Sequence, residues 1–100
     1  MTVHLSDGIE SIGTAAFGNC FNLVNIILPS SLKVINACAF QYCSSLKTIV
    51  LPEGLVQIDA EAFKYCVSLK NINIPDNLIE LGTNVFLDAN DLEYNPVFDS

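Results

Sequence analysis

The residues of this sequence that could carry chemistry are four cysteines and one histidine. Thiolates are nucleophiles and metal ligands, but a zinc site needs about four ligands in tetrahedral geometry. The sequence has no C-x-x-C pair and no second histidine. Three of the cysteines follow one another at intervals of 23 residues. Such a row favours buried free thiols, which pack as small apolar side chains, and a disulfide between neighbours in the row is the alternative. The cysteines are Cys20, Cys38, Cys43 and Cys66, of which Cys38 lies outside the row and is expected to be the most accessible.

His4 is the one candidate for a general base. A catalytic base needs a nucleophile or a carboxylate within hydrogen-bond reach. The expected neighbours of His4 are Thr2 and Asn25, and the three form no catalytic constellation. The motifs of P-loop proteins, zinc peptidases and serine hydrolases are also missing from the sequence. We therefore predict no catalytic residues, no cofactor and no metal ligands, and a protein that is not an enzyme.

Composition narrows the class of protein further. One hundred residues suit a single domain, and 51% of them are hydrophobic, which is too apolar for a disordered chain. The 11 acidic and 4 basic residues give a net charge of −7. Nucleic acid and anionic lipid both need clustered lysine and arginine, so neither is expected as a partner. No signal peptide or membrane-spanning segment is visible, so we expect either a cytoplasmic protein or a fragment of a surface protein.

The elements that would position these residues come from an internal repeat of 23 residues. The repeat divides a single domain, 1–100, into copies at about 6–28, 29–51, 52–74 and 75–97. Its recurring residues include Phe17, Phe40, Phe63 and Phe86; Leu23, Leu46, Leu69 and Leu92; Ile12, Ile35, Ile58 and Leu81; and Pro29, Pro52 and Pro75. The last copy departs from the pattern, with Ala89 in the cysteine place and Pro96 in the strand. A degenerate repeat and a tail are therefore expected from about residue 88.

Each copy predicts the same succession of short elements. Residues 23–28 alternate between buried and outward positions, as a strand with one buried face does, and the following proline ends the strand. A second apolar pair, Leu32 and Ile35, predicts a short extended or turn segment on the opposite side. Residues 37–43 contain small and bulky side chains without glycine or proline, which favours a short helical turn. The same prediction applies to 14–20 and 60–66.

The repeated unit resembles the BspA-like leucine-rich repeat. The stretch LPSSLKVINACAFQYCSSLKTIV matches the pattern of that class, LPxxLxxIxxxAFxxCxxLxxIxL, at its fixed places. The resemblance implies an α/β right-handed solenoid of about four coils. A parallel sheet would form one face, with short helical turns and second short strands elsewhere. It also implies a non-enzymatic protein-binding module of the adhesion or surface-recognition type, because repeats of this class occur on microbial surface proteins.

The outward positions of the predicted strands are the candidate protein-binding face. They are Thr2, His4, Asn25, Ile27, Thr48, Val50, Asn71 and Asn73. Ile27 and Val50 would form an apolar centre among neutral polar residues. A second surface carries Tyr42 and Tyr65. We expect them to stack on each other along the solenoid, and a role as binding anchors is the alternative.

The start of the chain supports an alternative function. Val3 aligns with Ile26, and Leu5 aligns with Leu28, so the chain begins inside a predicted buried strand. Repeat arrays normally need a polar cap at each end. Two expectations follow: the chain is part of a longer array, or a second copy covers the open end. The second expectation makes a self-associating structural protein, a homo-oligomer, the alternative to a protein-binding module.

Overall fold

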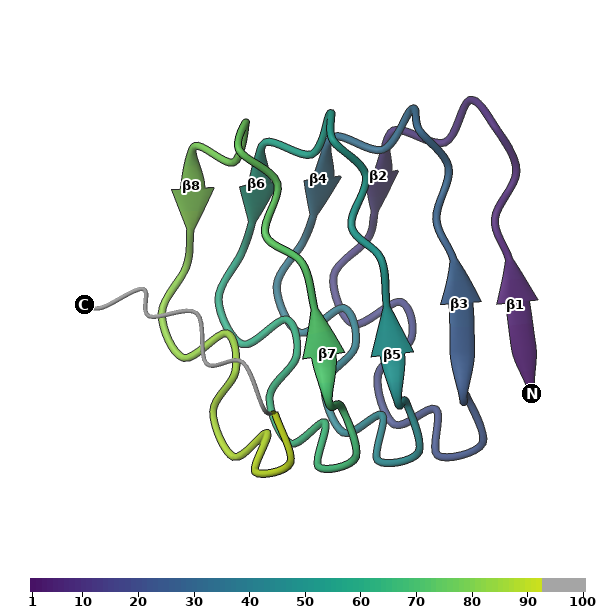
Figure 1. Ribbon diagram of the computed structural model, residues 1–100, viewed down its shortest axis with the longest axis vertical. Helices are drawn as coiled ribbons and strands as arrows, with labels where there is room; N and C mark the ends of the chain where they lie inside the picture. The colour runs from purple at the N-terminus through teal and green to yellow at the C-terminus, as the bar shows by residue number, and fades with distance from the viewer. Residues whose placement is uncertain (93–100) are drawn as a thin grey trace.

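The computed structural model describes residues 1–92, whose regular elements are short strands in two parallel sheets. The first sheet has the order β1 (Thr2–His4), β3 (Asn25–Ile27), β5 (Thr48–Ile49) and β7 (Asn71–Ile72). The second sheet has the order β2 (Ser11–Ile12), β4 (Val34–Ile35), β6 (Gln57–Ile58) and β8 (Glu80–Leu81). In Figure 1 the first sheet lies in front of the second, and the chain passes from one to the other in every coil.

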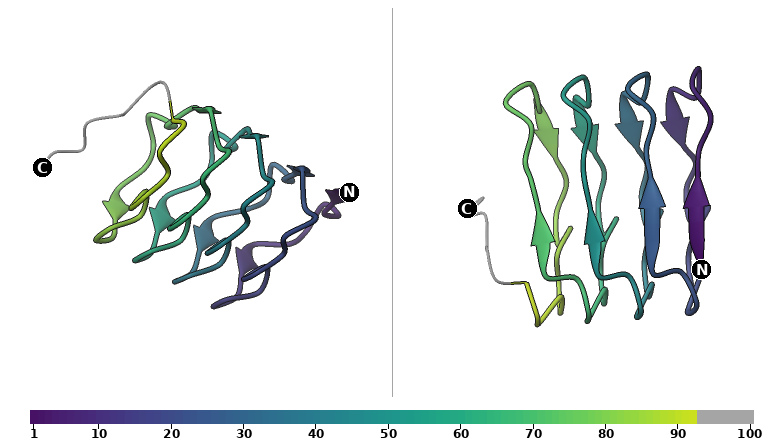
Figure 2. Two further views of the ribbon diagram at one scale, coloured as in Figure 1. Left: turned by 90° about the horizontal axis from the view of Figure 1, so that it is seen from below. Right: turned by 45° about the vertical axis from the view of Figure 1, so that its right-hand side comes forward.

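The register of both sheets equals the sequence repeat. Thr2 pairs with Asn25 in the first sheet, and Ile12 pairs with Ile35 in the second, so each partner lies one repeat further along. The predicted strands and the predicted second extended segments are therefore confirmed. Figure 2 shows the result as a row of similar coils lying side by side.

The core consists of like side chains stacked from coil to coil. Phe40 and Phe63 are completely buried, and their ring centroids lie 5.2 Å apart with an interplanar angle of 4°. Phe17 and Phe86 extend this row at both ends, with centroid distances of 5.4 and 5.7 Å. Among the described residues, no polar or charged side chain is buried. Stability therefore comes from apolar rows that run through the whole solenoid, because burial of each such side chain contributes about 1.5–3 kcal/mol.

The predicted helical turns are wrong, since residues 1–92 contain no helix. The segments 14–20, 37–43, 60–66 and 83–89 are runs of tight turns. Their hydrogen bonds alternate: the N–H of Gly18 donates to Ala15 within the turn, whereas the N–H of Phe17 donates to Ala39 of the next coil. A seven-residue helix would leave the N–H groups of its first turn without a partner, and it is too short to repay its nucleation cost. Bonding to the neighbouring coil satisfies the backbone instead.

These runs of turns, which we call the arms, hold two residues per coil at positive φ. The positions are Ala15, Cys38, Glu61 and Asn84, and then Asn19, Tyr42, Tyr65 and Asp88, with φ between 55° and 64°. Asparagine and aspartate tolerate this region, whereas other non-glycine residues lose roughly 1–2 kcal/mol there. The strain recurs at the same places in every coil, which indicates that the bonds between coils impose it.

The last described coil retains the arm geometry. Asp88 has φ 60°, and the N–H of Ala89 donates to Phe86. The rest of the predicted degenerate repeat, and the tail, lie outside the described residues. Because residues 1–92 contain no helix, this part of the chain has no helix that could cross a membrane.

Candidate functional site

The outer face of the first sheet carries the residues predicted to form a binding face. Asn25 is half-buried and the other seven are exposed. Val50 has the largest exposed fraction among the hydrophobic ones, 72%, and Ile27 is 44% exposed. The structure therefore gathers these side chains on one surface of four neighbouring strands. That a protein binds there stays a prediction.

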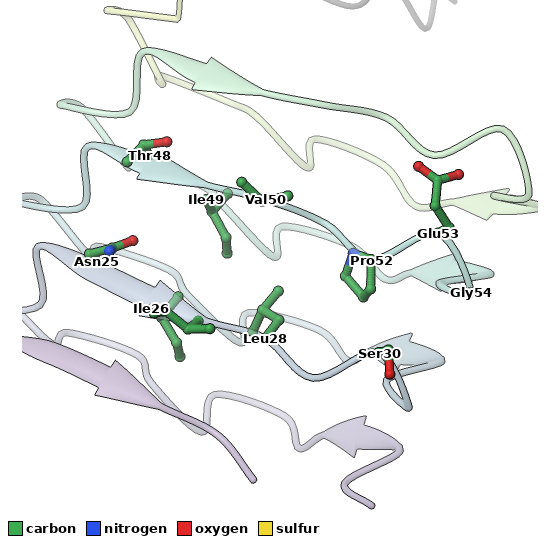
Figure 3. Close-up of a pocket in the computed structure, with 11 residues that line it drawn as sticks. Asn25, Ile26, Leu28, Ser30, Thr48, Ile49, Val50, Pro52, Glu53 and Gly54 are labelled. Atoms are coloured by element: carbon green, nitrogen blue, oxygen red, sulfur yellow. The ribbon is translucent and has the colours of Figure 1, made fainter. Parts of the chain in front are cut away.

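The face is hollowed by a groove between β3 and β5. The groove has a volume of about 670 Å³ and is lined mainly by apolar groups, including Ile27, Leu28, Val50 and Pro52. Figure 3 shows Asn25 and Thr48 at one end of the groove and Glu53 with Gly54 at the other. A second hollow of about 470 Å³ lies beside it, between β5 and β7.

The groove exists because the ladder between β3 and β5 opens early. β1 and β3 share three residue pairs, and the N–H of Leu5 adds a bond of 3.0 Å to Ile27. β3 and β5 share only the pair Asn25–Thr48. Beyond that pair the two strands separate, and the backbone that they would have paired lines the groove.

Between β5 and β7, a side chain bonds to the backbone where the ladder ends. The N–H of Leu51 donates to Oδ1 of Asn73 at 2.7 Å, and Nδ2 of Asn73 donates to the Leu51 carbonyl at 2.8 Å. The carboxamide therefore replaces a backbone partner. Val50 takes the place of Asn73 one repeat earlier, and its side chain has no group that could bond in this way. The sequence carried this difference, but its consequence was not predicted.

The cysteine row is structural. Cys43 and Cys66 are completely buried, and their thiols donate to the carbonyls of Phe17 and Phe40 at 3.0 and 3.1 Å. Burial raises the pKa of Cys43 to about 11 and that of Cys66 to about 12. All four cysteines are free, and residues 1–92 contain no cluster of three or more side chains that could hold a metal ion. Cys20 and Cys38 are both half-buried, so Cys38 is more accessible than Cys43 and Cys66, and its predicted rank above Cys20 stays a prediction.

These raised pKa values predict a loss of stability at alkaline pH. In the unfolded chain both thiols ionise near 9.0, whereas in the folded chain they stay protonated up to about 11 and 12. Unfolding therefore releases protons above pH 9, and the free energy of unfolding should fall as the pH rises from 9 toward 12. Urea unfolding at several pH values measures this slope. The double variant Cys43→Ala and Cys66→Ala should show a shallower slope, and an unchanged slope would refute the assignment.

The other candidate residues, His4, Tyr42 and Tyr65, lie on the surface. His4 is exposed on β1 at the edge of the sheet. Tyr42 and Tyr65 stack as predicted, with ring centroids 4.7 Å apart and an interplanar angle of 13°. Nζ of Lys64 lies 5.4 Å from the Tyr65 ring centroid and 3.8 Å from the Glu61 carboxylate. The tyrosines thus have partners within the arms.

The strands of both parallel sheets recur every 23 residues, and a row of leucines is buried between the sheets. These features define a leucine-rich repeat protein. The sequence pattern of the BspA type leucine rich repeat region (6 copies) matches residues 1–94. The chain therefore belongs to the BspA-type leucine-rich repeat family.

Solved structures of related proteins agree with this assignment. A leucine-rich repeat protein from Bacteroides ovatus is 34% identical, with a TM-score of 0.86 over 91% of this chain and 23% of its own. A leucine-rich repeat protein from T. pallidum is 31% identical, with a TM-score of 0.78 over 91% of this chain and 56% of its own. The chain thus spans less than two thirds of either structure. A comparison with curated protein sequences found no match.

Proposed function

We propose that the chain is a non-enzymatic protein-binding module that docks a partner on the outer face of its first sheet. The observation that carries the proposal is the exposure of Ile27 and Val50 at the centre of that face, next to the groove. Polar side chains surround them, including Thr48 and Asn71. An apolar centre within a polar rim is the usual composition of a protein interface. The family is generally non-enzymatic, which supports the same reading.

The sheet also suits binding on energetic grounds. Hydrogen bonds between the coils hold its backbone in place, so the chain loses little conformational entropy when a partner binds. Preorganisation of this kind favours affinity. The net charge of −7 favours a partner with basic groups, because complementary charge accelerates association. Adhesion or surface recognition is the finer form of this proposal, and it places the partner among host or matrix proteins and the chain in a surface protein.

Three lysine substitutions on the face test the proposal. The triple variant Asn25→Lys, Thr48→Lys and Asn71→Lys should lose at least about tenfold in affinity for a protein partner, because unpaired charges must lose water on binding. The partner is identified by a pull-down with the purified chain, and the affinity is then measured by interferometry. The matched control, Ser11→Lys, Thr14→Lys and Thr83→Lys, adds the same charge at exposed places away from this face. The proposal fails if the face variant binds as well as the control.

Self-association is the second candidate function. The observation that favours it is β1, the edge strand of the first sheet, beside which the core residues Val3 and Leu5 are only half-buried. Within residues 1–92 the outer edge of β1 has no partner strand, and an edge of this kind can pair with another chain. Sedimentation of the free chain over a range of concentrations tests this candidate. A mass that rises with concentration would support the homo-oligomer, and a monomer at high micromolar concentration would contradict it.

A further inference from the structure

The groove between β3 and β5 contains backbone groups that have no partner among the described residues. Leu28 lies just beyond β3 and Val50 just beyond β5, on facing sides of the groove (Figure 3). Neither the N–H nor the C=O of either residue takes part in a hydrogen bond within residues 1–92. Val50 is exposed and its backbone is open to water, whereas Leu28 is half-buried, and half-buried backbone groups without a protein partner call for an explanation.

The next coil shows which chemical group fits these backbone atoms. Leu51 lies one repeat after Leu28, and its N–H and C=O are both bonded by the carboxamide of Asn73. In the same sheet, therefore, one side-chain amide satisfies a backbone N–H and a backbone C=O at once. The amide does so by presenting its oxygen as acceptor and its NH₂ as donor. At Leu28 the equivalent side chain is Val50, and the place of the amide is empty.

From this equivalence we infer that the groove binds a carboxamide from a partner, the side chain of an asparagine or glutamine in an extended basic peptide segment. The amide oxygen accepts from the Leu28 N–H, and the amide NH₂ donates to the Leu28 C=O, as Asn73 does with Leu51. Ile27, Val50 and Pro52 pack against the apolar stem of the ligand. The inference rests on the proposed function, because the groove belongs to the same face, and it adds the chemical class that the face recognises.

Charge selects a basic segment around that amide. The side chain of Glu53 stands at the open end of the groove, and within residues 1–92 it has no ion pair, although Nζ of Lys33 lies beside Gly54 at the same end (Figure 3). A lysine or arginine close to the ligand asparagine would face this carboxylate. The net charge of −7 acts in the same direction over longer distances.

A peptide titration followed by NMR tests the inference on the whole chain. The probe is acetyl-Lys-Thr-Asn-Thr-Lys N-methylamide, and the control probe replaces asparagine by leucine, which has nearly the same shape but no amide. We expect the asparagine probe to shift the amide resonances of Leu28 and Val50. We expect the leucine probe to bind about tenfold more weakly or worse, since it lacks two hydrogen bonds. Equal binding of the two probes would overturn the inference and would leave an apolar groove.

Two asparagine substitutions make the test specific. Val50→Asn places a carboxamide beside Leu28, as Asn73 is placed beside Leu51, so it should fill the site and abolish probe binding. Ile79→Asn adds the same carboxamide at an exposed place outside the groove and should bind the probe as the parent does. Because Val50 is 72% exposed and Ile79 is 79% exposed, neither change should unfold the chain, and the dispersion of the amide spectrum verifies this. If Val50→Asn binds like Ile79→Asn, the inference is wrong.

The reciprocal variant separates this inference from the proposed function. Asn73→Val should free the N–H and C=O of Leu51 and create a second site, so that the shifts reach Leu51 and two probes bind per chain. An unchanged stoichiometry of one would count against amide pairing. The affinity of the pulled-down partner for the lysine variants is measured without any probe. The proposed function can therefore hold while the peptide titration shows that amide recognition fails. Both can also fail together.

Discussion

Replacing Phe40 by alanine should lower the free energy of unfolding by about 3–5 kcal/mol. Phe40 is completely buried, and its ring is stacked on Phe17 at 5.4 Å and on Phe63 at 5.2 Å. The substitution leaves a cavity in the middle of a row, where the coils on either side are tied by backbone hydrogen bonds and cannot close it. Small domains have total stabilities of about 5–15 kcal/mol, so a large part of the stability should be lost.

Urea unfolding followed by circular dichroism measures this effect, and Phe21 provides the control. Phe21 is 56% exposed, so Phe21→Ala removes the same atoms from a surface position. Surface changes of this kind usually stay within about 0.5 kcal/mol. Equal losses for Phe40→Ala and Phe21→Ala would contradict the assignment of the phenylalanine row to the core.

The second large effect is expected at a glycine. A methyl group on Gly82 would lie 2.7 Å from the carbonyl carbon of Asp59 and 2.8 Å from Cα of Ala60, both of which are backbone atoms. The coil cannot yield without shifting the ladder between β6 and β8. We therefore expect Gly82→Ala to cost about 1–3 kcal/mol or more, as overpacking of a close contact does.

Gly13 is the matched control for this substitution. It occupies the same place in the repeat as Gly82, three repeats earlier, and a methyl group there would meet nothing within 4 Å. Neither glycine has the positive φ that would penalise alanine on its own. Gly13→Ala should therefore leave the midpoint of urea unfolding nearly unchanged. If the two variants lose the same stability, close packing of the last coils is not the reason for glycine at position 82.

The sequence predicted the strands because their register is a property of the repeat. Ile26 and Ile49 recur at the same interval as the phenylalanines, and a parallel stack of identical coils is the arrangement that buries all of them together. The outward positions followed from the alternation along each strand. Val50 is exposed for this reason, and its position on the face needed no information beyond the pattern.

The arms and the groove could not be predicted in this way. Residues 37–43 favour a helix by composition, but the acceptor of the Phe40 N–H is Ala62, which belongs to the next coil. Local propensity contains no information about that partner. The groove likewise depends on the point at which the ladder between β3 and β5 ends. The sequence shows the exchange of asparagine for valine at position 50, whereas the opened ladder beside Leu28 follows only from the packing of the coils.

The bonds between the arms have an electrostatic consequence. The N–H of Phe17 donates to Ala39, that of Phe40 to Ala62 and that of Phe63 to Val85. The Ala39 carbonyl and the Phe40 N–H belong to one peptide unit, as do those of Ala62 and Phe63. Successive peptide units therefore join in a continuous hydrogen-bonded chain along the solenoid, and such chains strengthen by mutual polarisation.

Two further chains run beside it, beginning at the N–H groups of Ala15 and Asn19, and all three point the same way. Their peptide dipoles therefore add, as they do in an α-helix. The polarity with respect to the sequence is the reverse of a helix: the carbonyl end, with partial negative charge, lies at the first coil, and the N–H end lies at the last. Asp88 and Asp91 belong to that last described coil, where a negative charge is favoured. The arms thus give residues 1–92, which contain no helix, a directed electric field along the axis of the solenoid.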